Sequence, residues 1–135
     1  MAIAEAVLDE LKRRAREAAG LAYAPYSGFA VGAAVLTGSG EIHSGANVEN
    51  ASFGLSLCAE RNAIFQAVAR GERRLEALAV YTPTASATTP CGACRQVLLE
   101  FGANAIILCC TDDAVQERRF ALGELLPAAF GPANL

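Results

Sequence analysis

The sequence of 135 residues has no tryptophan, a single histidine and no excess of basic residues. Its formal net charge is −3. Binding to a nucleic-acid backbone requires a basic face, and holding a single strand also requires stacking aromatic side chains. The composition therefore argues against a nucleic-acid partner. Any histidine-ligated metal site would have to use His43, which falls in an expected strand.

Long apolar runs and an export signal are also missing. No run of about 18 apolar residues occurs, so we expect no transmembrane helix and no membrane partner. Glu5, Asp9 and Glu10 occupy the start of the chain, where a signal peptide would have basic residues followed by an apolar block. Five cysteines without such a signal indicate metal binding in a reducing compartment rather than disulfides, and we predict a cytoplasmic location.

The chain has the size and composition of one globular unit. Its length is typical of a single domain, and its 53% hydrophobic content is ample for one core. It contains no internal repeat, low-complexity segment or domain linker. We therefore predict one domain over residues 1–135.

Apolar periodicity and turn residues predict helices that alternate with strands. The expected helices cover residues 3–20, 57–70, 90–100 and 123–126, and the expected strands cover residues 29–36, 41–48, 75–82, 105–110 and 118–122. This order is typical of an α/β sandwich with a mixed sheet, in which functional sites lie at helix N-termini near strand ends. Asn47 and Glu49 alternate at the end of the second strand, so both can face one side.

Three cysteines and one glutamate, in two segments, have the spacing of a catalytic metal site. Cys91 and Cys94 are three residues apart, so on a helix their sulfurs share a face and can bind one ion. Cys58 is the third candidate ligand, and three protein ligands leave the fourth position of a tetrahedral zinc site open. Glu60 follows Cys58 by two residues, so it points elsewhere and can reach into a pocket as a proton carrier.

The residues next to these motifs predict how the cysteines are presented and how their charge is balanced. Thr89 is a suitable N-cap and Pro90 a suitable first helical residue. Cys91 is then expected in the first turn, where the helix dipole favours a thiolate. Three thiolates around one divalent cation leave excess negative charge, and we expect Arg61 and Arg95, which each directly follow a motif residue, to compensate it.

The motif segments resemble the small homotetrameric cytidine deaminases, whose zinc signature combines a C-x-E or H-x-E segment with P-C-x-x-C. The matching segments are residues 26–34, 45–52, 58–61, 90–97, 125–127 and 130–132. A cysteine at the first ligand position is similar to the tetrameric branch, since the dimeric branch has histidine there. The resemblance implies a homotetramer of three-layer α-β-α sandwiches, each with a central mixed sheet of about five strands.

The resemblance also implies an activity and the residues that carry it. The expected reaction is hydrolytic deamination of cytidine and deoxycytidine to uridine and deoxyuridine with release of ammonia, in pyrimidine salvage. The three cysteines would bind Zn²⁺, and the glutamate after the first cysteine would transfer protons. Asn47 and Glu49 would bind the ribose hydroxyl, and Phe29 would pack on the base. The backbone of Ala59 and Thr89 would bind the edge of the base.

Aromatic residues match family positions in the pocket wall or at subunit contacts beside it. They are Tyr26, Phe53 and Phe130. Phe53 stands where many members have tyrosine, so any hydrogen bond that the tyrosine hydroxyl makes across subunits is missing here. His43 stands where members usually have an apolar or aromatic residue, and it is interpreted as a surface or packing residue.

Other classes of protein fit parts of this pattern. A deaminase of bases in single-stranded nucleic acid shares the zinc chemistry but needs the basic groove that this chain lacks. A cytosine-containing antibiotic nucleoside is another substrate that the motif allows. A structural protein with a closed zinc site would need Cys109 or Cys110 as fourth ligand. Those neighbours point to opposite faces of a strand, so they cannot both reach one ion.

Overall fold

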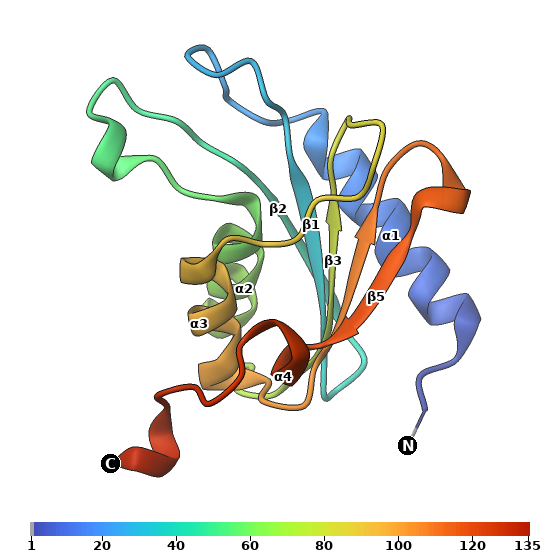
Figure 1. The fold of residues 1–135 in the computed structure, drawn as a ribbon, viewed down its shortest axis with the longest axis vertical. Helices are drawn as coiled ribbons and strands as arrows, with labels where there is room; N and C mark the ends of the chain where they lie inside the picture. The colour runs from blue at the N-terminus through green and yellow to red at the C-terminus, as the bar shows by residue number, and fades with distance from the viewer. Residues whose placement is uncertain (1) are drawn as a thin grey trace.

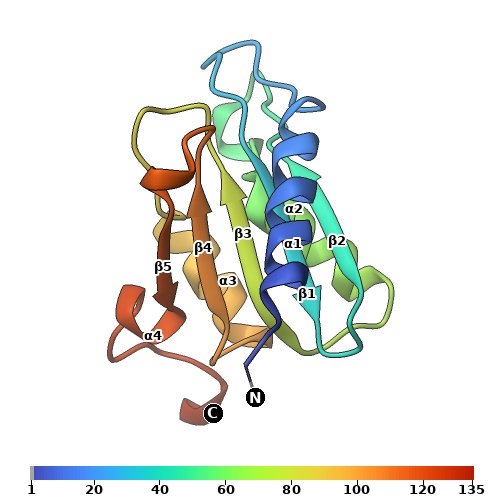
Figure 2. The same cartoon turned by 90° about the vertical axis from the view of Figure 1, so that its right-hand side faces the viewer.

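A computed structural model describes residues 2–135 as a twisted sheet with helices on both faces (Figure 1 and Figure 2). Five strands form one sheet in the order β2-β1-β3-β4-β5. Their bounds are Gly32–Thr37 for β1, Ile42–Ala46 for β2, Leu75–Tyr81 for β3, Ile106–Cys110 for β4 and Arg118–Ala121 for β5. β3 and β4 pair in parallel and the other neighbours pair antiparallel, so the sheet is mixed.

The helices form a layer on each face of the sheet. α1 (Glu5–Ala19) covers one face, and α2 (Ala59–Ala69) and α3 (Gly92–Phe101) cover the other, as Figure 1 shows. The short α4 (Leu122–Leu125) follows β5 at the sheet edge. These layers confirm the predicted α-β-α sandwich. No helix within residues 2–135 combines the length and apolarity needed to cross a membrane.

The residues of β1 contribute to two separate cores, because neighbouring strand residues point to opposite faces. Ala33 and Val35 pack in the core beneath α2 and α3, and Ala34 and Leu36 pack in the core beneath α1. All six residues of β1 are buried. This continuous buried run follows from the presence of helices on both faces of the sheet.

Two glycines allow the helices to approach the sheet closely. A Cβ atom at Gly32 would lie 1.9 Å from the carbonyl oxygen of Ala15 in α1. A Cβ atom at Gly45 in β2 would lie 2.7 Å from the backbone nitrogen of Ala63 in α2. Both positions therefore require glycine for packing rather than for a special backbone conformation.

One edge of the sheet brings together the segments that lead to α2 and α3. Gly32 at the start of β1 pairs with Ala46 at the end of β2 and with Tyr81 at the end of β3. The chain leaves β2 at this edge on its way to α2, and it leaves β3 at the same edge on its way to α3. The two cysteine segments, which open those helices, therefore start from one end of the molecule.

The observed strands are shorter than predicted at this edge. β2 ends at Ala46, so Asn47 and Glu49 lie in the following loop and not in the strand. Asn47 still makes strand-like contacts, because its carbonyl accepts a hydrogen bond from the N–H of Tyr23 (3.0 Å) and its N–H donates to the carbonyl of Val31 (3.3 Å). The loop therefore holds both polar residues beside the sheet.

The prediction that Thr89 caps the third helix was wrong. α3 begins at Gly92 with Cys91 as its N-cap, and the Cys91 carbonyl accepts the first helical hydrogen bond from the N–H of Arg95 (3.0 Å). The Thr89 hydroxyl instead accepts a hydrogen bond from the Arg95 guanidinium (3.0 Å). Within residues 2–135, no side chain caps the N-terminus of α3.

Candidate metal centre and adjoining pocket

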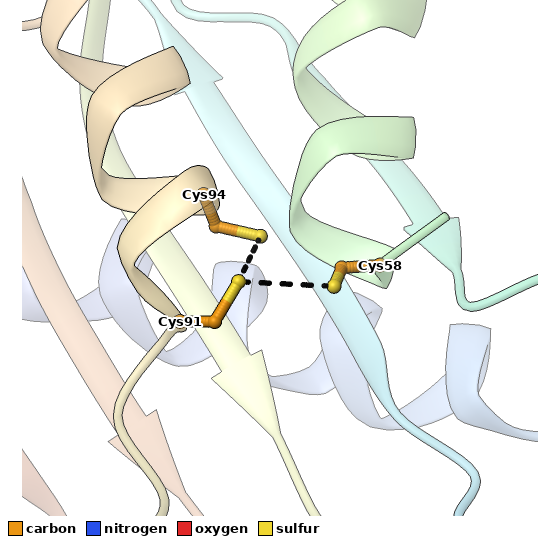
Figure 3. A group of neighbouring side chains, drawn as sticks. All are labelled: Cys58, Cys91 and Cys94. Atoms are coloured by element: carbon orange, nitrogen blue, oxygen red, sulfur yellow. Dashed lines mark hydrogen bonds between the residues drawn. The ribbon is translucent and has the colours of Figure 1, made fainter. Parts of the chain in front are cut away.

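Three cysteine side chains from two helices point toward one another (Figure 3). Cys58 is the N-cap of α2, Cys91 is the N-cap of α3, and Cys94 lies in the first turn of α3. The Cys91 sulfur lies 3.9 Å from the Cys58 sulfur and 3.5 Å from the Cys94 sulfur. All three lie within 4.8 Å of one another, and residues 2–135 contain no second group of three such ligand side chains.

The sulfur positions fit a zinc ion. A tetrahedral ion with Zn–S bonds of about 2.3 Å separates its sulfur ligands by about 3.8 Å. The measured separations of 3.9 Å and 3.5 Å are close to this value. Three sulfur ligands leave one tetrahedral position that the protein does not fill, which is the arrangement of catalytic zinc sites.

The charges around the cysteines favour one anionic sulfur. The pKa of Cys58 is lowered to about 5, first because Cys94 donates a hydrogen bond to it and also because Arg61 Nη2 lies 3.3 Å from its sulfur. The neighbouring Cys58 thiolate and burial both raise the pKa of Cys94. Further thiolates are therefore unfavourable in this group unless a cation joins it, and a divalent metal ion meets that need.

The two arginines expected to balance the thiolates make different contacts. Arg61 lies against a cysteine sulfur, and its buried Nε has no hydrogen-bond partner among the described residues. Arg95 donates instead to three oxygens, which are Pro90 O (2.8 Å), Leu125 O (2.7 Å) and Thr89 Oγ1 (3.0 Å). The position of Arg95 thus differs from the expected one, because it joins the segment before α3 to the C-terminal segment.

Glu60 lies in the first turn of α2 and is only 5% exposed. It lines the same cavity as Cys58 and Cys91. Burial raises the pKa of its carboxyl, and the negative charge of Cys58 acts in the same direction. A carboxyl with a raised pKa holds a proton more readily than an exposed carboxyl, which suits a group that takes up and delivers protons in general acid–base catalysis.

A cavity of about 260 Å³ adjoins the cysteine group. Its wall contains most of the residues predicted for the site, namely Phe29, Asn47, Glu49, Cys58, Ala59, Glu60, Thr89 and Cys91. It also contains residues that the sequence did not single out, namely Ser27, Val31, Val80, Thr82 and Thr88. Ser27 and Val31 belong to the segment before β1, Val80 and Thr82 lie at the end of β3, and Thr88 lies in the segment before α3. The sheet register brings the first two segments together. Ser27, Val31 and Thr88 lie close in sequence to the predicted Phe29 and Thr89, whereas no sequence signal marked Val80 or Thr82.

Asn47 and Glu49 hold the loop before β1 as well as lining the cavity. Asn47 Oδ1 accepts a hydrogen bond from the N–H of Val31 (2.9 Å), and its Nδ2 donates to the carbonyl of Phe29 (2.8 Å). The Glu49 carboxylate accepts hydrogen bonds from the hydroxyl and the N–H of Ser27. The hydroxyl bond is the main reason why the pKa of Glu49 is lowered. The cavity therefore has an ionised acceptor at this end.

The aromatic side chains expected near the site are exposed. Tyr26 and Phe53 pack edge to face, with ring centroids 5.7 Å apart, and they line a hollow beside the cavity. Phe53 is 72% exposed and Phe130 is 64% exposed. The Phe130 carbonyl accepts a hydrogen bond from Gln96 Nε2 (2.9 Å), which fixes the C-terminal segment against α3.

His43 and the last two cysteines lie apart from the metal centre. His43 is in β2, with Nε2 3.0 Å from a carboxylate oxygen of Glu41. Cys109 packs in the core beneath α2 and α3, whereas Cys110 packs in the core beneath α1. The two cysteines therefore point to opposite faces, as expected, and within residues 2–135 neither joins the sulfur group.

Comparison with known proteins agrees with this geometry. Residues 6–110 match the family model described as the cytidine and deoxycytidylate deaminase zinc-binding region. The chain is 49% identical to a cytidine deaminase of Mycobacterium tuberculosis over 125 residues, which cover 93% of this chain and 90% of the relative. It is 42% identical to a cytidine deaminase of Sporosarcina psychrophila over 130 residues, covering 95% and 94% of the two chains.

Solved structures give the same result. The crystal structure of cytidine deaminase from Burkholderia pseudomallei has a TM-score of 0.86 and 45% identity, and the match covers 90% of this chain and 98% of that one. The structure of cytidine deaminase from Mycobacterium tuberculosis has a TM-score of 0.78 and 48% identity, with coverage of 92% and 97%. With its fold and its cysteine group, the chain belongs to the zinc-dependent cytidine deaminase family of enzymes.

Proposed function

We propose that this protein catalyses the hydrolytic deamination of cytidine and deoxycytidine to uridine and deoxyuridine, with release of ammonia, in pyrimidine salvage. The observation that carries the proposal is the position of Glu60. Its buried carboxyl, with a raised pKa, lines the cavity that also contains the sulfur-bearing residues Cys58 and Cys91. A proton carrier beside a metal centre is what hydrolysis of an amino group from an aromatic ring requires.

The metal centre in this proposal consists of Cys58, Cys91 and Cys94, and its ion is Zn²⁺. When bound, the ion would supply the Lewis acidity that makes water nucleophilic near neutral pH. Arg61 would offset part of the thiolate charge from its place against the Cys58 sulfur. Arg95, whose hydrogen bonds all go to oxygen atoms, would position the segment that leads into α3.

Glu60 would move the protons of the reaction. The attacking water gives a proton to Glu60, and Glu60 delivers it to the ring nitrogen next to the carbon that is attacked. Glu60 then takes the remaining proton of the hydroxyl that has added to the ring carbon and gives it to the exocyclic amino group. The carbon–nitrogen bond breaks as the carbonyl forms, and the amino group leaves as ammonia. The sum is cytidine plus water giving uridine plus ammonia, with Glu60 returned to its starting state. Burial supports this role because it keeps bulk water from exchanging the proton.

The remaining wall residues would bind the nucleoside. The Glu49 carboxylate accepts three hydrogen bonds from the loop, so about one of its four acceptor positions remains for a ribose hydroxyl. Asn47 uses one of its two N–H groups on Phe29 O and retains the other. The ring of Phe29 would pack on the base, and the backbone of Ala59 and Thr89 would bind its edge.

The size of the cavity supports a small ligand. Its volume of about 260 Å³ lies near the lower limit of small-molecule sites. The net charge of −3 also disfavours a polymer with a phosphate backbone. A free nucleoside therefore fits better than a base within a nucleic acid.

The assembly and its location are also part of the proposal. Large apolar side chains remain exposed, among them Leu21, Phe53, Leu55, Phe65 and Phe130. Such a set is typical of a subunit interface, and we propose a homotetramer in the cytoplasm, where the five free cysteines would stay reduced. Light scattering of the purified protein should give about four times the chain mass of 14.0 kDa.

The test is turnover of cytidine by purified protein whose zinc content is measured in the same sample. We expect loss of cytidine absorbance, equal release of ammonia and about one zinc ion per chain. Glu60→Gln should retain zinc and lose at least about 100-fold in kcat. Glu76→Gln, in β3 at the far end of the sheet, is the matched control and should keep full activity. Zinc binding without turnover, or near-normal activity of Glu60→Gln, would contradict the proposal.

A further inference from the structure

Thr82 is a buried polar residue in the cavity wall that the proposed reaction does not use. It directly follows β3, is 2% exposed, and lines the cavity. Its N–H donates to the carbonyl of Cys110 (3.1 Å), which fixes its backbone to β4. A hydroxyl at this depth affects binding strongly, because its donor and acceptor positions have few alternative partners.

The direction of the hydrogen bonds in the loop after β3 is determined by one acceptor. Thr84 Oγ1 donates its single proton to the carbonyl of Ser86 (2.6 Å), since a carbonyl can only accept. Thr84 Oγ1 also lies 2.7 Å from Thr82 Oγ1. With its own proton already used, Thr84 can only accept in that contact, so Thr82 donates to Thr84. The Thr82 hydroxyl can then still accept a hydrogen bond through its lone pairs, but its only proton is already donated to Thr84.

The strand order places Thr82 at the end of the cavity away from the ribose residues. Asn47 and Glu49 follow β2, the edge strand, whereas Thr82 follows β3, and β1 lies between these strands. All three residues line one cavity. If Asn47 and Glu49 bind the ribose, as the proposed function has it, the base lies toward β3. The part of the base most distant from the ribose carries the exocyclic amino group.

We propose that Thr82 is a specificity-determining residue, whose hydroxyl accepts a hydrogen bond from the exocyclic amino group of the base and disfavours the carbonyl that replaces it in the product. The inference rests on the proposed function. Because its proton is already donated to Thr84, the Thr82 hydroxyl can only accept a hydrogen bond from a ligand. It therefore attracts an amino group, which is a donor, and repels a carbonyl oxygen, which is an acceptor. The cavity wall therefore distinguishes cytidine from uridine at the atom that changes in the reaction.

The alternative is that the Thr82 hydroxyl only stabilises the loop. In that case loss of the hydroxyl would weaken the binding of cytidine and the binding of uridine by the same factor, because a displaced loop does not distinguish an amino group from a carbonyl on the base. The ratio of the uridine inhibition constant to the cytidine KM separates the two interpretations. Protein stability alone does not, since both interpretations allow it to fall.

The experiment measures that ratio for zinc-loaded enzyme. Thr82→Val should lower the ratio about threefold to tenfold, the effect of one hydrogen bond gained or lost, whereas Thr82→Ser, which keeps the hydroxyl, should retain it. Thr84→Val leaves Thr82 in place but removes its acceptor, so the freed proton can bind the product carbonyl. This variant should therefore strengthen inhibition by uridine.

Thr37→Val is the matched control for loss of a buried threonine hydroxyl. Thr37 Oγ1 lies 2.9 Å from the hydroxyl of Ser39, two residues later, as Thr82 does with Thr84, but at the other end of β1. In Thr37→Val the ratio of the uridine inhibition constant to the cytidine KM should equal that of the wild type. An enzyme that deaminates cytidine but keeps the wild-type ratio in both Thr82→Val and Thr84→Val would refute this inference alone. A wild-type protein with zinc but no turnover would refute the proposed function, and this inference with it.

Discussion

The contact between β1 and α1 at Gly32 leaves no room for a side chain. A Cβ atom there would lie 1.9 Å from the carbonyl oxygen of Ala15 and 2.5 Å from the backbone nitrogen of Ala19. Both atoms belong to the backbone of α1, so the whole helix would have to move away from the sheet. Overpacking of a core costs about 1–3 kcal/mol, and a clash with backbone belongs at the upper end. We expect Gly32→Ala to lower the free energy of unfolding by about 3 kcal/mol.

Urea denaturation of the zinc-loaded protein, at one fixed protein concentration, measures this change. With a slope of about 1.5 kcal/mol per molar urea, typical of a small domain, the midpoint should fall by about 2 M. Gly123→Ala is the control, because a Cβ atom there meets nothing within 4 Å. Its effect should stay below about 1 kcal/mol. A Gly32→Ala midpoint within about 0.3 M of the wild type would refute the packing argument.

Three further predictions concern charged residues. Burial would raise the pKa of Glu117, but hydrogen bonds from Lys12 and Arg119 outweigh it and leave the pKa lowered. A carboxylate whose pKa is lowered in the folded state stabilises the fold at pH values above its unfolded pKa of about 4.3, and this stabilisation is lost as the pH falls through the folded pKa. Glu117→Gln should therefore lower the urea midpoint at pH 7 and have little effect near pH 3. Arg61→Gln should move the acid limb of the pH–rate profile upward by about one unit, because the thiolates lose a neighbouring positive charge. Arg95→Lys should lower the thermal midpoint while zinc content stays unchanged, because an ammonium cannot reach all three oxygens that the guanidinium binds.

Each of these predictions has a result that would contradict it. An equal loss of stability at pH 7 and pH 3 would show that Glu117 acts through packing and not through its charge. An unchanged pH–rate profile would remove Arg61 from the charge balance of the metal centre. Loss of zinc in Arg95→Lys would mean that Arg95 supports the cysteine sulfurs directly. Zinc content, the pH–rate profile and the melting curve together separate these roles.

The sulfur cluster was predictable because its residues are tied to simple local geometry. Cys91 and Cys94 are three residues apart at a helix start, so their sulfurs must share a face. Cys58 opens the other helix, and the alternation of strands and helices was enough to expect a site at helix N-termini near strand ends. The α/β sandwich with a mixed sheet followed from the same alternation, since each strand and helix has its own apolar pattern, whereas its three layers were implied by the family resemblance.

The ends of elements were less predictable, because tertiary contacts compete with local capping. Thr89 and Pro90 form a good local helix start, yet α3 begins after Cys91. In the folded chain the Arg95 guanidinium binds the Thr89 hydroxyl and the Pro90 carbonyl, so these residues make a tertiary contact outside the helix. Arg95 reaches these atoms from the second turn of α3 and also holds Leu125, which no local rule could indicate.

Residues of the cavity wall without a motif could not be found from the sequence. Ser27 and Thr82 lie in segments rich in small polar residues, where one hydroxyl looks like another. Their selection depends on the strand register, which places the start of β1 beside the ends of β2 and β3. The direction of the Thr82 hydroxyl depends in turn on a carbonyl four residues away. Such information exists only in the folded chain.

The N-cap positions of Cys58 and Cys91 have a consequence for folding. An ion held by both residues would close a loop that contains all of α2 and β3, as a covalent cross-link would. Binding would then restrict the unfolded chain, and unfolding would have to release the ion. Metal affinity would then be coupled to the stability of the α2–α3 layer, because both would report one free energy. Substitutions far from the cavity that loosen this layer would therefore weaken metal binding.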